Sequence, residues 1–290
     1  MVKVAQTLSY LKRVSMQLRT PERLRVHYEL EKTLANKLKN ALVHERSALY
    51  SQVYDQLFRE IYDHPQLTNK ENAQQRVRTI SWQLGLLKRF LTQATVVMEI
   101  GAGDCALSCA MAPRVKKVYA VDVSAEIAKG VVFAENTQLL ILQNGVDIPL
   151  EPAMVTLAYS YQLMEHLHPE DAIAQLQEVY RVLQPGGHYI CVTPNKFTGP
   201  HDISRYFDDM AMGFHLKEYT LTELESLFRS VGFTHFVFYA GGKGIFVRLP
   251  LFLVRLCEKI IACMSLALRK KLCRNVFARA FLGITLVARK

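Results

Sequence analysis

The sequence predicts an α/β fold built on a mainly parallel sheet with helices on both faces. From residue 96 onward, apolar runs of strand length alternate with segments of helical spacing, which is typical of parallel strands joined by crossover helices. Two glycines one residue apart, Gly101 and Gly103, follow the first apolar run and indicate a tight turn before a helix. Residues 1–94 show helical spacing with almost no strand signal, so we expect a helical extension in front of the sheet.

Seven strands are expected in the sheet domain, which we assign to residues 95–290. The last crossover helix has clear ends, because Thr220 and Glu223 form a capping box before it and Gly232 closes it. The run Pro185-Gly186-Gly187 is expected to turn between a helix and a strand. The expected strands are 96–100, 117–123, 138–143, 154–160, 186–193, 235–240 and 283–289, and the expected helices are 104–113, 125–136, 169–184 and 220–231.

The N-terminal extension is expected to form three helices, over Val26–Arg46, over Ser47–Tyr62, and over a segment whose apolar face ends at Leu91. The third helix runs directly into the strand at Val96, so we expect it to pack on the sheet. The role of the extension stays open between a lid and a contact in a homodimer. A helical insertion at about residues 244–280 is expected between the last two strands.

Composition indicates a folded globular chain, because half of the 290 residues are hydrophobic and 21% are charged. The six cysteines include no C-x-x-C pair, so we expect buried thiols and neither a disulfide nor a metal site. A reducing cytoplasm is then the expected compartment, with contact to a membrane surface left open. The N-terminus is too charged for a secretory signal, and no uninterrupted apolar run approaches the roughly 20 residues of a membrane helix.

Positive charge is concentrated at the two ends of the chain. Residues 1–90 hold 16 Lys and Arg against 8 acids, and residues 241–290 hold 11 against one, whereas residues 91–240 hold 9 against 17. Basic ends of this kind suit nucleic acid, anionic lipid or simply solvent. No aromatic and basic RNA motif accompanies them, so we expect no specific nucleic-acid partner.

The glycine turn lies in VVMEIGAGDCALSCAMA, residues 96–112, and fits two kinds of nucleotide site. Gly101, Gly103 and Ala106 match the G-x-G-x-x-G/A fingerprint of dinucleotide enzymes. The same residues match the E-x-G-x-G turn of S-adenosylmethionine-dependent methyltransferases. In both, a carboxylate at the end of the second strand takes a ribose, and Asp122 stands nineteen residues past Gly103.

Four ordered motifs favour the second alternative. They are the glycine turn, NGVDIPL at 144–150, MVTLAYSYQLMEHL at 154–167 and VYRVLQPGGHYICVTPN at 179–195. Together they resemble the class I S-adenosylmethionine-dependent methyltransferases, in particular the type 11-like branch that methylates small molecules. The resemblance covers about residues 95–240 and the last strand. It implies a Rossmann-like sheet whose last strand is antiparallel, and S-adenosylmethionine as cofactor.

The resemblance also implies which residues bind the cofactor. Glu99 matches the acid that orders the glycine loop near the methionine amino group, and Asp122 matches the acid that takes both ribose hydroxyls. The sequence departs from the family at Cys105, where a third glycine is common, and at Asn144, where the adenine-side residue is usually acidic. The implied cofactor residues are Glu99, Gly101, Ala102, Gly103, Asp104, Asp122, Val123, Ser124, Asn144, Gly145, Ser160 and Tyr161.

Polar residues after the fourth and fifth strands are candidates for binding the methyl acceptor, because open α/β sheets bind ligands at the carboxyl ends of their strands. A general base is needed only if the acceptor must lose a proton. The candidate bases are His166, His201 and His215, and the candidate acceptor-binding residues are Gln162, Asn195, Asp202, Arg205 and Tyr206.

The sequence therefore predicts a methyltransferase that acts on a small acceptor, and it leaves open whether that acceptor is apolar or lipid-like. The insertion carries Leu253, Leu256 and Ile260 at helix-face spacing with basic residues elsewhere, which suits a membrane surface, a cover over an apolar pocket, or packing on the sheet. Two other functions stay open at this point: a nicotinamide-dependent oxidoreductase, and an RNA-modifying or RNA-binding protein that uses the basic ends.

Overall fold

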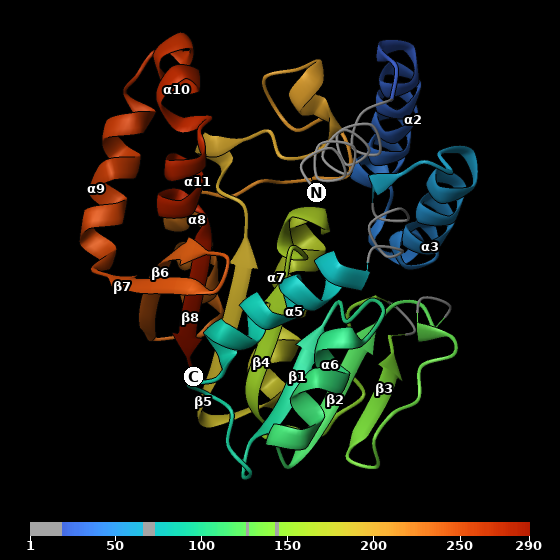
Figure 1. Cartoon of the computed structure of the whole chain (residues 1–290), viewed down its shortest axis with the longest axis vertical. Coiled ribbons are helices and arrows are strands. Elements are labelled where there is room, and N and C mark those ends of the chain that lie inside the picture. Colours follow the sequence, from blue (N-terminus) through green and yellow to red (C-terminus); the bar gives the residue numbers. More distant parts are fainter. Residues whose placement is uncertain (1–18, 66–72, 126–127, 143–144) are drawn as a thin grey trace, which may run out of the picture.

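An eight-stranded sheet forms the centre of the protein (Figure 1). The structure is a computed structural model that describes residues 19–65, 73–125, 128–142 and 145–290. The strand order is β3-β2-β1-β4-β5-β8-β6-β7, in which β8 runs antiparallel between β5 and β6, and β7 is antiparallel to β6. The strands are β1 (Val96–Ile100), β2 (Lys117–Asp122), β3 (Thr137–Ile141), β4 (Val155–Tyr161), β5 (Leu183–Thr193), β6 (His235–Gly242), β7 (Ile245–Leu249) and β8 (Ile284–Arg289).

Helices α5 (Ala73–Leu87) and α6 (Ala106–Met111) cover one face of the sheet. Successive residues of a strand point to opposite faces, so Val97 packs under these helices while its neighbour Met98 packs on the other side. The second face is covered by α7 (Pro169–Val182) and α8 (Leu221–Val231). The sheet is therefore buried on both faces, as its mainly parallel strands require.

A separate helical layer lies beyond the carboxyl ends of the strands (Figure 1). It contains α2 (Pro21–Asn40) and α3 (Val43–Glu60), which pack against each other and against Phe214 and Leu216. Among the described helices, none is long and apolar enough to cross a membrane. The insertion consists of α9 (Leu251–Ala262), α10 (Leu266–Cys273) and α11 (Val276–Leu282) at one edge of the molecule.

The structure confirms the α/β fold class but corrects several elements. The helix expected over 125–136 is wrong in its described part, because Gly130 takes φ +81° and residues 131–136 form no helix before β3. The extra strand β7 makes the sheet eight-stranded, since the glycines around Lys243 allow a tight hairpin after β6. The run Pro185-Gly186-Gly187 lies inside β5, beside a register shift opposite β4, and is not a separate turn.

A buried ion pair joins the helical layer to the sheet domain. Arg46 of α3 donates to both carboxylate oxygens of Asp171, at 2.8 and 2.7 Å, and to Glu170 at 2.8 Å. The hydroxyl of Tyr50 donates to Asp171 and accepts the backbone N–H of His168. Because both Arg46 and Asp171 are buried, each charge depends on the other for compensation.

We expect Asp171→Asn to lower the free energy of unfolding by about 3 kcal/mol, because it leaves the Arg46 charge buried without its bidentate partner. Urea denaturation of the full chain measures this. The matched control is Glu170→Gln, which removes the largely exposed carboxylate beside the same guanidinium and should cost no more than about 1 kcal/mol. Equal losses in the two variants would contradict the assignment of Asp171 as the anchor.

Candidate functional site

The loop after β1 is shaped to let a ligand approach its backbone. Gly101 and Gly103 have φ of +72° and +54°, values that residues other than glycine rarely adopt. The N–H groups of Gly101 and Ala102 donate to the carbonyl of Val121, which ties the loop to the end of β2. A Cβ added at Gly103 would meet no atom within 4 Å, so open space lies in front of the loop.

Asp122 ends β2 beside this loop and is held by three backbone N–H groups. Its Oδ2 accepts from Gly103 at 2.8 Å, and its Oδ1 accepts from Val123 at 2.7 Å and Ser124 at 3.2 Å. A carboxylate offers about four acceptor positions, so the position left over is on Oδ2. The site therefore suits at least one ribose hydroxyl, and Asp122 also fixes the loop that would bind the rest of the cofactor.

Glu99, at the end of β1, is buried and accepts a 2.6 Å hydrogen bond from the hydroxyl of Ser108 in α6. Burial raises the pKa of this carboxyl to about 8. A cationic amino group nearby would favour the ionised form and lower this pKa again. The arrangement fits the role that the resemblance implies for Glu99, next to the methionine end of the cofactor.

Cys105 and Asp104 complete the loop. Cys105 takes the left-handed conformation, φ 55°, in which the family often has glycine, and its buried side chain packs with Ala102, Ala120 and Ala128. Burial raises the pKa of its thiol to about 12, so this cysteine is a packing residue. Asp104 accepts the N–H of Ala106 at the helix start and pairs with Arg76 of α5 at 2.9 Å.

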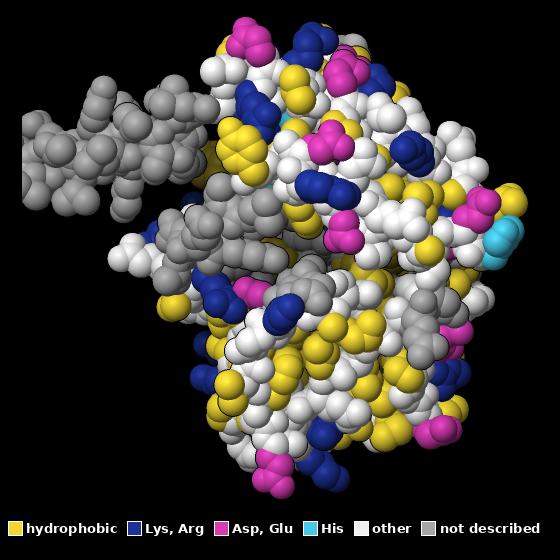
Figure 2. All heavy atoms as spheres, turned by 90° about the vertical axis from the view of Figure 1, so that its right-hand side faces the viewer, with side chains coloured by type: hydrophobic (Ala, Val, Ile, Leu, Met, Phe, Trp, Pro, Cys, Tyr) yellow, Lys and Arg dark blue, Asp and Glu magenta, His cyan; other side chains and the backbone are white. Residues whose placement is uncertain are grey.

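The other expected cofactor residues differ in how accessible they are to a ligand. Gly145 has φ +76° and open space before its Cβ position, like Gly103. Tyr161 is 42% exposed at the end of β4, whereas the buried hydroxyl of Ser160 pairs with Tyr189 inside the sheet domain. Asn144 lies outside the described residues. The face drawn in Figure 2 is hollowed between the helical layer above and the sheet below, on the side where the strands end.

A cavity of about 270 Å³ adjoins Tyr161. Its walls come from α5, from the ends of β4 and β5, from the β6–β7 hairpin and from α11. They combine aromatic and aliphatic surface with a few polar groups, as small-molecule sites do. The lining includes Trp82, Tyr161, Gln162, His201 and Phe246.

His201 is the one of the three candidate bases that lines this cavity. Its Nε2 lies 3.2 Å from the carbonyl of Asn195 and 2.8 Å from the hydroxyl of Thr198. A carbonyl can only accept, so Nε2 carries the proton and Nδ1 keeps a lone pair. Burial lowers the pKa of the ring, which is consequently neutral at pH 7 and able to take a proton.

The other two candidate bases lie together with Glu165 and do not line the cavity. Burial lowers the pKa of His166 to about 3 and raises that of Glu165 to about 7. Burial opposes protonation of His215 as well, but its hydrogen bond to Glu218 and the nearby carboxylates raise its pKa overall.

Most of the expected acceptor-binding residues make structural contacts. The amide of the fully buried Asn195 donates to Glu258 and accepts from Phe197, and Asp202 accepts the N–H groups of Ser204 and Gly213. Arg205 and Tyr206 form an exposed pair that does not line the cavity, whereas Gln162 and Asn195 both line it. Sequence reasoning missed the cavity wall formed by α5, although Trp82, the one tryptophan of the chain, was a signal for it.

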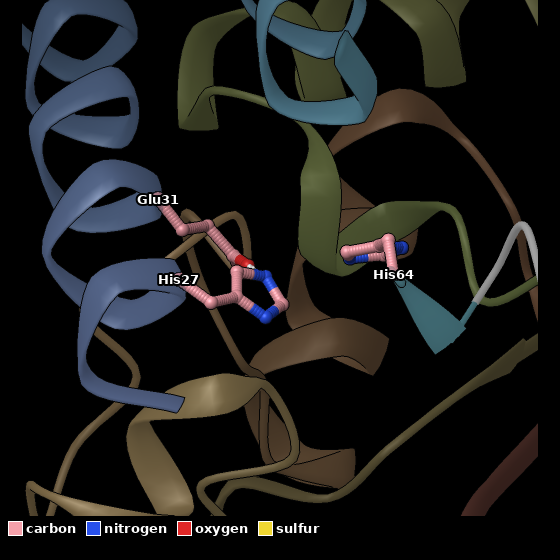
Figure 3. Close-up of side chains that lie close together, drawn as sticks. All are labelled: His27, Glu31 and His64. Atoms are coloured by element: carbon pink, nitrogen blue, oxygen red, sulfur yellow. Dashed lines mark hydrogen bonds and ion pairs between the residues drawn. The ribbon is translucent and has the colours of Figure 1, made fainter. Parts of the chain in front are cut away.

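A further group of ionisable residues lies in the helical layer (Figure 3). His27 and Glu31 come from α2 and face each other at 2.7 Å, with His64 across from them. Arg19 lies 2.7 Å from Nδ1 of His27, and the N–H of Phe214 donates to Glu31. These contacts anchor α2 to the segment that follows β5.

Comparisons with known proteins agree with this geometry. A family model described as a methyltransferase domain matches residues 98–191. A probable S-adenosylmethionine-dependent methyltransferase from Mycolicibacterium smegmatis is 28% identical over 141 residues, 43% of this chain. The match spans about half, 52%, of that relative's length.

Two solved structures share the fold. One is a putative methyltransferase complexed with the Trm112 methyltransferase activator of Haloferax volcanii, with a TM-score of 0.53 and 16% identity over 77% of this chain and 94% of that one. The other is the 1,6-didemethyltoxoflavin-N1-methyltransferase of Burkholderia thailandensis, bound to 1,6-didemethyltoxoflavin and S-adenosylhomocysteine, with a TM-score of 0.52 and 19% identity over 86% and 91%. The matched methyltransferase domain, the curated relative and the sheet order together support a class I S-adenosylmethionine-dependent methyltransferase.

Proposed function

We propose that the protein transfers the methyl group of S-adenosylmethionine to a small acceptor bound in the cavity beside Tyr161. The proposal rests on the position of this cavity next to the glycine loop. In the register of β1 and β4, Ile100 pairs with Ser160, so the glycine loop and Tyr161 begin at the same level of the sheet. A cofactor on the loop would then lie next to the cavity. The cofactor supplies an electrophilic sulfonium methyl, and the protein supplies position and orientation.

The cavity favours an acceptor with an apolar, ring-sized body and an ionisable O–H or N–H group. Trp82, Tyr161 and Phe246 offer flat apolar surface, and the volume of about 270 Å³ is near the lower end for small-molecule sites. His201 is the group we assign to remove the acceptor's proton, through Nδ1. A dinucleotide enzyme is the weaker alternative, because neither the family match nor the curated relative points to one.

Calorimetric titration of the full chain with S-adenosylhomocysteine, and separately with NAD, tests the cofactor. We expect S-adenosylhomocysteine to bind and Asp122→Asn to weaken that binding at least tenfold, about 1.4 kcal/mol, because a charge-assisted acceptor is lost. The control variant is Glu135→Gln, which neutralises an exposed acid between β2 and β3 and should leave affinity unchanged. Binding of NAD alone would overturn the proposal.

A panel of phenols and N-heterocycles, assayed by formation of S-adenosylhomocysteine, tests the acceptor site. For any acceptor that is turned over, we expect His201→Asn to lower kcat by about 100-fold or more. Since the pKa of His201 is depressed, its basic form persists as pH falls, and the acid limb of the wild-type rate should lie below pH 6.5. If His201→Asn kept the wild-type kcat, His201 would not be the general base.

We also propose that the insertion rests on an anionic membrane surface. Helix α9 packs inward through Val254 and Glu258, while the apolar side chains of Phe252, Leu256 and Ile260 are more than half exposed. Residues 241–290 hold 11 basic residues against one acid, Glu258, which is buried. Three of the basic residues pair with acids of other segments, Arg255 with Glu225 and both Lys270 and Arg274 with Asp209, so the segment keeps a net positive charge. Exposed apolar groups among cations suit anionic lipid headgroups.

Co-sedimentation with vesicles measures this contact. We expect at least tenfold stronger binding to phosphatidylglycerol vesicles than to phosphatidylcholine vesicles, and loss of most of it in a Phe252→Ser and Ile260→Ser double variant. The matched control is Val132→Ser, which changes a 91% exposed apolar residue elsewhere. Equal binding to both vesicle types, or none, would contradict the proposal.

A further inference from the structure

Glu165, His166 and His215 bring three metal-ligating groups together outside the cavity. One ligand atom from each lies within 4.8 Å of the other two. Glu165 and His166 belong to the short 3-10 turn Met164–His166 that follows β4, and His215 comes from the segment between β5 and α8. Glu165 and His215 are buried, and His166 is partly buried. The cluster therefore lies at the carboxyl end of the sheet, sheltered from bulk water.

The hydrogen bonds leave one nitrogen of each histidine available. Nδ1 of His166 is 3.1 Å from the carbonyl of Phe214, which can only accept, so Nδ1 carries the proton. The hydroxyl oxygen of Tyr54, 3.2 Å away, is then a second acceptor for that N–H. Nδ1 of His215 is 2.8 Å from the carboxylate of Glu218 and donates to it. In both rings Nε2 therefore keeps a lone pair that can bind a metal. Metal-binding histidines usually donate their other ring N–H to a carbonyl or carboxylate, which orients the ring.

Glu165 provides the third group. Its Oε2 accepts a 2.8 Å hydrogen bond from the hydroxyl of Thr193. Its Oε1 is buried and has no hydrogen-bond partner among the described residues. Burying a polar oxygen without a partner costs about 1–3 kcal/mol, and more for a charged group, so such an atom calls for an explanation.

The surrounding charge favours a cation. Glu218 and Asp202 both interact electrostatically with His215, and Glu31 interacts with His166. All three carboxyl groups are buried, with exposed fractions of 8%, 9% and 5%. The groups facing the cluster that can carry positive charge are His215 itself and His64, and burial lowers the pKa of His64 to about 4, so it is neutral at pH 7; Lys39 faces Asp202. A protonated His215 would offset part of this negative charge, and a divalent ion would offset more of it.

The group of His27, Glu31 and His64 in Figure 3 differs from this cluster in which ligand atoms remain available. Nδ1 of His27 accepts from Arg19, so its Nε2 carries the proton and donates to Glu31. Both carboxylate oxygens of Glu31 are used, by His27 and by the N–H of Phe214. Neither ring nitrogen of His27 is left as a ligand, neither oxygen of Glu31 lacks a hydrogen bond, and the nearby guanidinium opposes a cation.

We propose that Glu165, His166 and His215 bind one zinc ion, through Oε1 and the two Nε2 atoms. Two imidazoles and one carboxylate are a ligand set that zinc favours, and three protein ligands leave a fourth position for water. The ion would join the turn after β4 to the segment after β5. Thr193, which holds Glu165, also lines the cavity, so the site shares that residue with the cavity wall. This proposal revises the expectation from sequence that the chain has no metal site.

Zinc binding by the full chain, freed of any histidine tag and treated with a chelator, tests the proposal. We expect about one zinc per chain by elemental analysis after dialysis and a saturable isotherm on titration with zinc chloride. Glu165→Gln keeps the shape and the Thr193 contact, and should weaken zinc binding about 10-fold or more; His215→Ala should weaken it further. Cobalt added to the wild type should give the visible absorption typical of a four-coordinate site. The Glu165→Gln variant should lack this absorption.

Two control variants make the result specific. His44→Ala changes an exposed histidine of α3, and His27→Ala disrupts the other group; both should keep zinc binding. Absence of zinc binding in the wild type, or equal binding by wild type and Glu165→Gln, would overturn the proposal. Loss of binding in His27→Ala, with retention in His215→Ala, would also overturn it by moving the site to α2. The readouts do not require methyl transfer, so they stand apart from the proposed function.

Discussion

Buried carboxylates fix the segment between β5 and α8, and the carboxyl end of the sheet depends on them. Glu258 of α9 accepts from the amide of Asn195 and from the N–H of Leu221, which sets the two ends of the segment. Glu218 accepts the N–H of His201, and Glu31 of α2 accepts that of Phe214. Charged acceptors make stronger hydrogen bonds than neutral ones, and buried donors must be satisfied. A segment with little regular structure is thereby held in one conformation.

This constraint links three parts of the chain that are distant in sequence. The insertion supplies Glu258, the helical layer supplies Glu31, and Arg46 ties the same layer to Asp171 at the start of α7. The extension and the insertion both act as supports of the site, because each inserts a carboxylate or guanidinium into it. Removal of either would expose donors that have no other buried partner.

Local pattern was enough to predict seven of the eight strands and the glycine loop. β1 and β2 are short apolar runs, and the left-handed turns after β1 require glycine, so Gly101, Gly103 and Asp122 could be recognised in the sequence. The helix expected over 125–136 was wrong, because Gly130 takes a left-handed conformation that ends any helix at this point, and the prediction did not take that glycine into account. The β6–β7 hairpin was missed because its apolar residues resembled the start of a helix.

The chemistry of the polar segment could not be predicted, because residue type does not show which atoms are already used. Asn195 and Asp202 suited a ligand by type, yet both hold the backbone around them. The sequence did not show which ring nitrogens of the three candidate bases are already used, and hydrogen bonds from other segments distinguish them.

The carbonyl of Asn195 assigns the proton of His201 and leaves a neutral ring beside the cavity, where a base is useful. The carbonyl of Phe214 and the carboxylate of Glu218 do the same for His166 and His215, but there the free nitrogens meet a carboxylate oxygen without a partner. The same local arrangement, one ring nitrogen held by an acceptor, thus suits the proposed base in one place and the proposed ligand set in the other. What decides between them is the neighbour of the second nitrogen, and that neighbour is set by the fold.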